Sequence, residues 1–132
     1  MSIRAGNIAE VSFMLRAMKA HFTILSPYSK DCSYDVAVDY NGKINRVQCK
    51  ATSTPLKRKN GSIYYKIICS HGYTGKKLYT KEHCDYFALY IATLDLFYIV
   101  PQSVIKTKTI MLYPDKKDHK YSKYLENFSI LK

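Results

Sequence analysis

Long apolar runs and closely spaced cysteines are both missing from this chain of 132 residues. No apolar stretch approaches the roughly 18 to 20 residues that a membrane span needs, and the N-terminus has no apolar leader segment. We therefore expect an intracellular, cytoplasmic protein with no membrane partner. The four cysteines form no C-x-x-C pair, which argues against a zinc site and a disulfide framework. The chain also lacks the G-x-x-x-x-G-K-[ST] pattern of a nucleotide-phosphate loop.

Acidic side chains are scarce as well. Ten Asp and Glu residues stand against 21 Lys and Arg residues, which gives a formal charge of +11. Such an excess favours a polyanionic partner, because basic side chains release counterions from phosphates. The chain is also rich in Lys, Tyr, Ile and Asn, the usage of an AT-rich genome, so genome composition is the competing explanation. We expect nucleic-acid binding.

Residues 34–50 are predicted to form a β-hairpin. Two runs rich in Val, Ile and Tyr flank Asn41-Gly42, a pair that tolerates the positive φ angles of a type I′ turn. A two-residue loop sets a register in which Asp35 lies opposite Gln48. Lys50 follows two residues later on the same face, because side chains alternate along a strand. A carboxylate, an amide and an ammonium group would therefore meet on one face, which is an active-site pattern.

The opposite face of the hairpin is predicted to be apolar and to carry Val36, Val38, Val47 and Cys49. Two alternatives remain open at the level of sequence. A three-residue loop would pair Asp35 with Cys49 and move Asp35 to the other face from Gln48. An exposed polar strand face with a weak Asp35–Lys50 pair would need no catalytic role.

An acidic residue on one strand, followed on the next by acid-x-Lys, resembles the core motif of the PD-(D/E)XK nuclease superfamily. The matching residues are Asp35 and the segment Gln48-Cys49-Lys50. Tyr34 stands where the family has Pro, and Gln48 replaces the second acid. The Gln variant is similar to the branch that contains a homing endonuclease encoded in a group I intron.

That branch also carries an upstream helical Glu and a later Asp-Tyr-Phe strand, matched here by Glu10 and by Asp85-Tyr86-Phe87. Taken alone, Glu10 is an ordinary exposed acid in an early helical turn, where a carboxylate suits the helix dipole. The order of the elements and the resemblance predict the same fold. We expect one nuclease domain over residues 1–132, of the α/β class and close to α+β, with a mixed central sheet flanked by helices and a restriction-endonuclease-like core.

The resemblance further implies a Mg²⁺-dependent endonuclease that hydrolyses phosphodiester bonds in double-stranded DNA, with Mn²⁺ as a substitute metal. The implied catalytic residues are Glu10, Asp35, Gln48 and Lys50. Asp35 would be the main metal ligand, beside Gln48, the Cys49 carbonyl group and Glu10, and Lys50 would orient or activate the attacking water. A homo-oligomer, either a dimer or a tetramer, would cut both strands. A junction-resolving nuclease and a catalytically inactive DNA-binding module are the competing interpretations.

Polar and basic residues after the second hairpin strand are the predicted DNA contacts, because they follow the catalytic strand closely. They are Thr52, Ser53, Lys57, Arg58 and Lys59, together with Tyr73, Lys76 and Lys77 in a later loop. A solvated basic turn and an ordinary long loop are the alternatives. His71 and His83 have no partner at ligand spacing and are expected to be structural or exposed.

Periodicity predicts the remaining elements. Residues 4–21 are predicted to form an amphipathic helix with the apolar stripe Ile8, Val11, Leu15, Met18 and Phe22. Strands are expected at 22–25, 62–70, 86–91 and 96–100, of which the last two are apolar enough to be covered on both faces. A short C-terminal helix is predicted from the spacing of Tyr121, Tyr124, Leu125 and Phe128.

Overall fold

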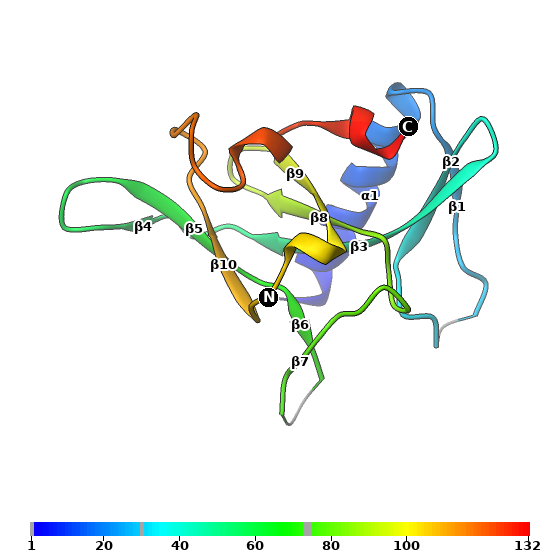
Figure 1. Cartoon of the computed structure of the whole chain (residues 1–132), viewed down its shortest axis with the longest axis horizontal. Helices are drawn as coiled ribbons and strands as arrows, with labels where there is room; N and C mark the ends of the chain where they lie inside the picture. The colour runs from blue at the N-terminus through cyan, green and yellow to red at the C-terminus, as the bar shows by residue number, and fades with distance from the viewer. Residues whose placement is uncertain (1, 30, 73–74) are drawn as a thin grey trace.

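A mixed five-stranded sheet lies at the centre of the computed structural model, which describes residues 2–29, 31–72 and 75–132. Its strands run in the order β1-β2-β3-β8-β9 (Figure 1). They are β1 (Thr23–Leu25), β2 (Val36–Tyr40), β3 (Lys43–Thr52), β8 (Tyr86–Ile91) and β9 (Leu96–Pro101). β3 and β8 pair in parallel, and the other neighbours in this sheet pair antiparallel. The predicted mixed central sheet is confirmed.

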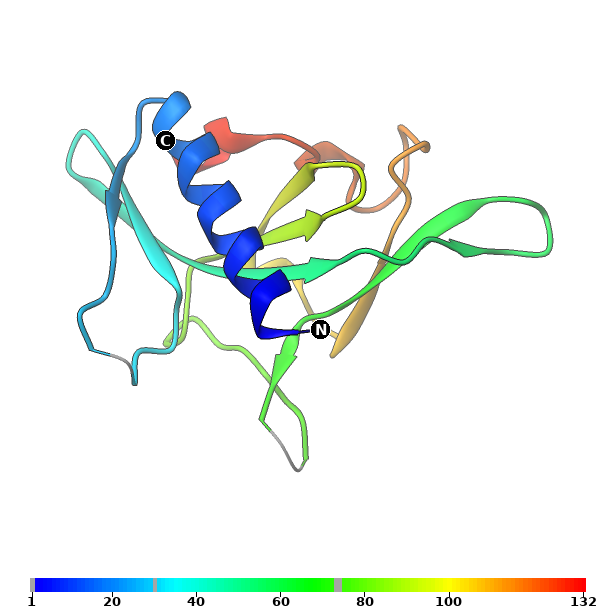
Figure 2. The same cartoon turned by 180° about the vertical axis from the view of Figure 1, so that it is seen from behind.

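The other elements include those that cover the two faces of this sheet. They are α1 (Ile3–Lys19), β4 (Leu56–Lys57), β5 (Ile63–Ile68), β6 (Ser70–His71), β7 (Lys77–Leu78), β10 (Thr109–Leu112) and the 3-10 helices η1 (Gln102–Val104), η2 (Ser122–Tyr124) and η3 (Phe128–Leu131). Figures 1 and 2 show α1 across one face, and a second antiparallel sheet, β10-β5-β4, packs on the other. A helix therefore flanks one face, and a small sheet takes the place of a helix on the other.

β8 and β9 are buried on both faces, as their nearly continuous apolar sequences predict. Successive side chains alternate between two hydrophobic clusters. Ala88 and Ile99 belong to the cluster beneath α1, and Leu89 and Val100 belong to the cluster beneath the small sheet. The two strands therefore hold both layers together.

The Asn41-Gly42 turn gives the β2–β3 hairpin its predicted register. Both residues have positive φ angles, 52° and 89°, as a type I′ turn requires. The pairs run from Tyr40 with Lys43 to Val36 with Val47, and Asp35, just before β2, bonds to Val47 and Cys49 of β3. The apolar face of the hairpin packs beneath α1. This register excludes the three-residue loop.

The start of α1 is fixed by Ser2, whose Oγ accepts a hydrogen bond from the Ala5 N–H at 3.1 Å. The first turn contains no acidic residue. Glu10 lies about two turns further along, so the expected helix-dipole role is wrong. Among the described residues, no helix is both long and apolar enough to span a bilayer.

The apolar stripe of α1 faces away from the central sheet. The helix instead buries Ala9, Phe13 and Ala17, which are spaced by four residues on the other side. The two alanines let the helix backbone approach the sheet closely, and Phe13 packs against Phe97 and Phe128. Four stripe side chains are between 49% and 60% exposed, namely Ile8, Val11, Leu15 and Met18. These four side chains therefore form a surface stripe, whereas Phe22, the fifth residue of the predicted stripe, lies beyond the end of α1 and is buried.

The C-terminal segment forms the 3-10 helices η2 and η3, so the predicted C-terminal helix is wrong. Glu126, between them, has a φ of 53°, a conformation that interrupts a helix. Its carboxylate accepts a hydrogen bond from the Phe97 N–H at 2.7 Å and pairs with Arg16 of α1. These contacts fix the segment to β9 and α1, and helical periodicity does not reveal them.

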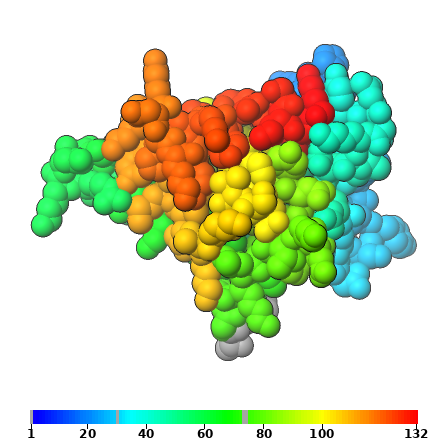
Figure 3. All heavy atoms as spheres, viewed as in Figure 1, coloured from blue at the N-terminus to red at the C-terminus, as the bar shows by residue number. Residues whose placement is uncertain are grey.

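The β4–β5 ribbon projects from the body of the protein (Figures 2 and 3). Leu56 pairs with Tyr64 and Lys57 with Ile63. Gly61, with a φ of 92°, helps to close the turn between the two strands. The predicted basic turn is therefore the tip of an exposed two-stranded ribbon.

Candidate active site

Asp35 immediately precedes β2, and two contacts hold it against β3. Its backbone N–H donates to the Val47 carbonyl oxygen at 3.0 Å, and its side-chain Oδ2 accepts from the Cys49 N–H at 2.8 Å. Burial raises the pKa of the Asp35 carboxyl, while the Cys49 hydrogen bond and the charge of Lys50 oppose this rise. The protein's own groups thus offset the charge of Asp35 only in part.

Lys50 lies on β3, two residues beyond Gln48. Its Nζ donates to the Ser70 carbonyl oxygen at 3.3 Å and lies 5.1 Å from the centre of the Tyr79 ring. Burial lowers the pKa of Lys50, the charge of Asp35 opposes the shift, and the charge of Lys76 adds to it. A lysine in this state can hold a phosphate oxygen or exchange a proton.

Tyr79 supports Lys50 and belongs to an aromatic cluster that contains both histidines. The Tyr79 ring centre lies 4.7 Å from that of His71 and 5.7 Å from that of His83, and its edge contacts Phe87. Burial raises the pKa of Tyr79 to about 12, so its hydroxyl stays neutral at physiological pH. The histidines therefore pack as part of the wall behind Lys50.

Gln48 and Glu10 both lie near Cys49. The Gln48 Nε2 is 3.5 Å from the Cys49 carbonyl oxygen, at the outer limit of a hydrogen bond. Burial raises the pKa of the Cys49 thiol well above its usual value, and the charges of Asp35 and Glu10 raise it further. Glu10 is therefore close enough to act electrostatically on this position of β3, although it comes from α1.

The described residues contain no group of three His, Cys, Asp or Glu side chains that could hold a metal ion. Mg²⁺ does not need such a cage, because it binds through one or two carboxylates and keeps waters and phosphate oxygens in its shell. Asp35 supplies a partly uncompensated carboxylate, Glu10 supplies a second one nearby, and Gln48 adds a neutral amide oxygen. This oxygen-rich set fits a hard divalent cation.

A cleft of about 700 Å³ opens beside Lys50. Three of the predicted DNA contacts line it, namely Thr52, Ser53 and Lys76. Lys66 and Ser70 line it as well, and sequence reasoning missed both. Strand alternation was the available signal for Lys66, since its neighbours Tyr65 and Ile67 are buried and Lys66 must face outward. The cleft therefore brings together lysines from separate parts of the chain.

The remaining predicted DNA contacts lie outside this cleft. Lys57, Arg58 and Lys59 line a separate hollow of about 530 Å³ on the β4–β5 ribbon. Lys77 is exposed on β7. Tyr73 lies outside the described residues. The predicted contacts thus divide into a cleft group and a ribbon group.

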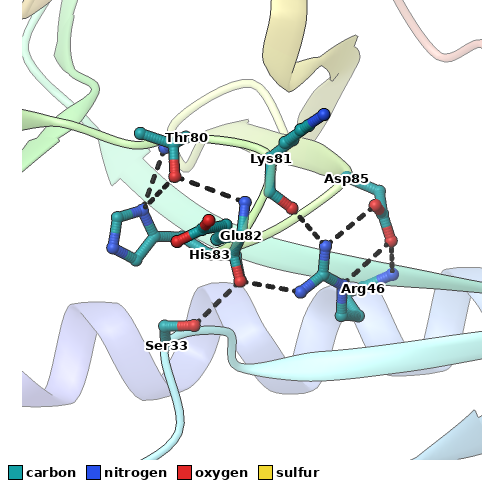
Figure 4. Close-up of polar contacts among 7 residues, drawn as sticks. All are labelled: Ser33, Arg46, Thr80, Lys81, Glu82, His83 and Asp85. Carbon is teal, nitrogen blue, oxygen red and sulfur yellow. Dashed lines mark hydrogen bonds and ion pairs between the residues drawn. The ribbon is translucent and has the colours of Figure 1, made fainter.

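Asp85, from the matched Asp-Tyr-Phe segment, pairs with Arg46 of β3 (Figure 4). Asp85 Oδ2 accepts from the Arg46 backbone N–H at 2.8 Å and from its Nε at 3.2 Å, and Asp85 Oδ1 accepts from Nη2 at 3.1 Å. The same guanidinium donates to the carbonyl oxygens of Lys81 and Glu82. This network ties β3 to the turn before β8 and so fixes the parallel pair that carries Lys50.

Replacing Asp85 by Asn is expected to lower the free energy of unfolding by about 1–2 kcal/mol at neutral pH, with allowance for partial exposure. Burial alone would raise the pKa of Asp85, but the hydrogen bonds and charge of Arg46 bring it below its usual value. A carboxyl with a lowered pKa stabilises the fold above its unfolded-state pKa, and this contribution is lost as the pH falls through the folded-state pKa. In urea unfolding, the difference from the wild type should therefore shrink in acid.

Asp31→Asn is the control for this variant, because Asp31 is exposed in the loop before the hairpin. It should change the free energy of unfolding by less than about 0.5 kcal/mol. An equal loss in both variants, or no loss in Asp85→Asn, would contradict the structural role of the Arg46–Asp85 pair.

Comparisons with known proteins identify the class to which this fold and site belong. A family model described as PD-(D/E)XK endonuclease matches residues 2–131, so the chain belongs to this family and is a nuclease. Among solved structures, the chain is similar to a bacterial homing endonuclease, I-Ssp6803I, with a TM-score of 0.81 and 24% sequence identity. The match covers 99% of this chain and 93% of the other, and it shows a common fold. No curated protein matches the chain. The predicted family and restriction-endonuclease-like fold are confirmed.

Proposed function

We propose that this nuclease is a metal-dependent endonuclease that hydrolyses double-stranded DNA, and that it is a site-specific, intron-encoded homing endonuclease. We expect it to act in the cytoplasm, on the DNA of the nucleoid. The observation that carries the proposal is the placement of Asp35 beside Cys49 and of Lys50 at a cleft that also contains Lys66 and Lys76. The likeness in fold to a bacterial homing endonuclease supports the biological role.

Mg²⁺ is the metal that we propose, with Mn²⁺ able to replace it. Asp35 would be its main ligand, with Gln48, the Cys49 carbonyl group and Glu10 at the border of its shell. When bound, such an ion supplies positive charge at the phosphoryl oxygen and makes a water easier to deprotonate. The raised pKa of Asp35 supports this assignment, because a nearby cation would offset the electrostatic cost of burying the carboxylate.

Lys50 has two roles in this proposal. Its Nζ is held at the cleft by the Ser70 carbonyl group and the Tyr79 ring, where it would orient the attacking water and offset phosphate charge. Burial lowers the pKa of Lys50, so the neutral form is reached at a lower pH than for a free lysine. The neutral amine would accept a proton from the water.

The DNA contacts would differ between the two groups of residues. Thr52, Ser53 and Lys76 would bind phosphates next to the cleaved bond, because they line the cleft. The more distant contacts would be Lys57, Arg58, Lys59, Tyr73 and Lys77. Binding through so many basic side chains should weaken steeply as salt is added.

The active form would be a homo-oligomer, either a dimer or a tetramer, that cuts both strands. The exposed stripe of α1 is the surface that we expect to pack between copies. Its residues Ile8, Val11, Leu15 and Met18 alternate spacings of three and four, the spacing of a helix–helix seam. Such a stripe on a helix is self-complementary about a twofold axis.

Leu15→Glu is therefore expected to raise the dissociation constant of the oligomer by about 100-fold or more, because it places a charge in the middle of the seam. Light scattering after gel filtration measures the change. Ile44→Glu is the matched control, since Ile44 is an exposed apolar residue of β3 outside the stripe. A wild type that is monomeric at all concentrations would contradict the proposed interface.

Digestion of a DNA panel in Mg²⁺ tests the proposed function. The panel contains random duplex, a four-way junction, single strands and the intron-free allele of the gene that the coding sequence interrupts. Cleavage of the intron-free allele alone is the expected result. Preference for the junction would replace homing with junction resolution. Salt-dependent binding without cleavage of any member would leave a DNA-binding module.

A further inference from the structure

The outward face of the small sheet β10-β5-β4 carries side chains that the proposed catalysis does not use. The inward side chains of these strands are buried, namely Tyr65, Ile67, Ile110 and Leu112. The residues between them face outward, because side chains alternate along each strand. Directly paired residues share a face, so the outward rows are Leu56 with Tyr64, Lys66 with Met111, and Ile68 with Thr109.

This outward face combines positive charge with exposed apolar groups. Segment 56–68 contains Lys57, Arg58, Lys59 and Lys66, and neither it nor segment 109–113 contains Asp or Glu. Ile68 is 54% exposed, Met111 is 37% exposed and Leu56 is 36% exposed. The major groove offers matching groups, since guanine presents acceptors to Lys or Arg and thymine presents a methyl group. A second copy of this chain would bring the same positive charge, so DNA is the better complement.

Arg58 is held in place on this face. Its guanidinium carbon lies 5.0 Å from the Tyr64 ring centre and 5.7 Å from that of Tyr113, and its Nη2 is 3.3 Å from the Met111 sulfur. The two tyrosine rings stack with their centres 5.6 Å apart. A side chain that is already ordered loses less entropy on binding. Arg58 therefore suits a contact of fixed geometry, such as a base edge.

The outward face continues directly from the candidate active site. Lys66 and Ile68 belong to it and also line the cleft beside Lys50. At its far end, β4 and β5 extend beyond the body as a two-stranded ribbon (Figures 1 and 3). The major groove is wide enough to admit such a ribbon. A duplex with a phosphate in the cleft could therefore place its neighbouring major groove against this face.

We propose that the outward face of β4, β5 and β10 reads base edges in the major groove beside the cleaved bond. Lys66 and Arg58 contact guanine, and Ile68 and Met111 contact thymine methyl groups. This inference rests on the proposed function and adds the surface that gives the nuclease its sequence preference.

Selection from a library of random-sequence duplexes tests this proposal, with Ca²⁺ in place of Mg²⁺ to suppress cleavage. The wild type should enrich a defined motif. Lys66→Ala and Ile68→Ser should still bind DNA but lose about ten-fold or more of discrimination at one or two base positions each. Lys117→Ala, in an exposed loop outside this face, should enrich the wild-type motif.

A uniform loss of affinity for all sequences in both variants would assign the face to phosphate contacts and overturn the proposal. A change of oligomeric state in Ile68→Ser would overturn it in favour of a protein interface. A wild type that cuts duplex but enriches no motif would overturn it and leave the nuclease function intact. A wild type that neither binds nor cuts duplex would defeat the proposed function, and this inference with it.

Discussion

Asp35→Asn should cleave DNA at least about 1000-fold more slowly than the wild type, because it removes the negative charge proposed to hold the metal, an interaction worth several kcal/mol. Asparagine keeps an oxygen that can accept the Cys49 N–H, so the fold and the β2–β3 register should survive. The dissociation constant for DNA should stay within about two-fold of the wild-type value, since Asp35 is not expected to contact phosphate directly. Single-turnover cleavage in Mg²⁺ and fluorescence anisotropy in Ca²⁺ measure the two quantities.

Asp31→Asn serves as the control for charge, because it makes the same chemical change at an exposed position of the segment before β2. Its cleavage rate should match that of the wild type. Cleavage by Asp35→Asn at a comparable rate would remove Asp35 from the site, and the hairpin face would then be structural.

Lys50→Ala should lower the single-turnover rate by about 100- to 1000-fold, the usual range for loss of a positioned acid or base. Lys76→Ala is the matched control, because Lys76 lines the same cleft but lies further along the chain. It should weaken DNA binding while the rate at saturating enzyme changes by less than about five-fold. Equal effects of the two substitutions on the rate would reduce Lys50 to one of several phosphate contacts.

The two proposed roles of Lys50 differ in their pH dependence. Only the neutral amine accepts a proton, and burial lowers the pKa of Lys50 from 10.5, so the wild-type rate should rise with pH and level off below that value. Lys50→Arg keeps the positive charge but does not deprotonate in this range. It should lose the alkaline rise. Full activity in Lys50→Arg with an unchanged profile would leave charge compensation as the only role.

The predictable part of the site rests on local signals. Asn41-Gly42 allows positive φ angles at two successive residues, and this turn sets the register that brings Asp35 to the β3 segment that contains Gln48. Lys50 then follows from strand alternation alone. The apolar runs of β8 and β9 likewise predict strands with two covered faces.

The orientation of α1 could not be predicted from periodicity, because the helix has two faces that a sheet could bury. Four of its apolar side chains form the exposed stripe, while two alanines and Phe13 form the packed face. Close approach of a helix to a sheet favours small side chains, which contribute little to a hydrophobic pattern. Hydrophobic periodicity therefore indicated the exposed face of α1 instead of the face that packs on the sheet.

Long-range contacts were also beyond the reach of sequence patterns. Glu126 lies where the C-terminal helix was expected. Its carboxylate accepts a hydrogen bond from the Phe97 N–H and forms an ion pair with Arg16. Asp85 accepts hydrogen bonds from Arg46 of β3, and Arg46 also donates to the Glu82 carbonyl oxygen in the turn before β8. Each of these acids has its partner on another element, and no spacing within its own segment identifies that partner.

Cleavage of duplex DNA by the wild type, followed first in Mg²⁺, then in Mn²⁺ and then with excess EDTA, tests the central claim most directly when Asp35→Asn is run beside it. Cutting by the wild type in either metal, with none in EDTA and none by Asp35→Asn, is the predicted result. Cutting that persists in EDTA, or in Asp35→Asn, would contradict a metal-dependent nuclease site at this hairpin.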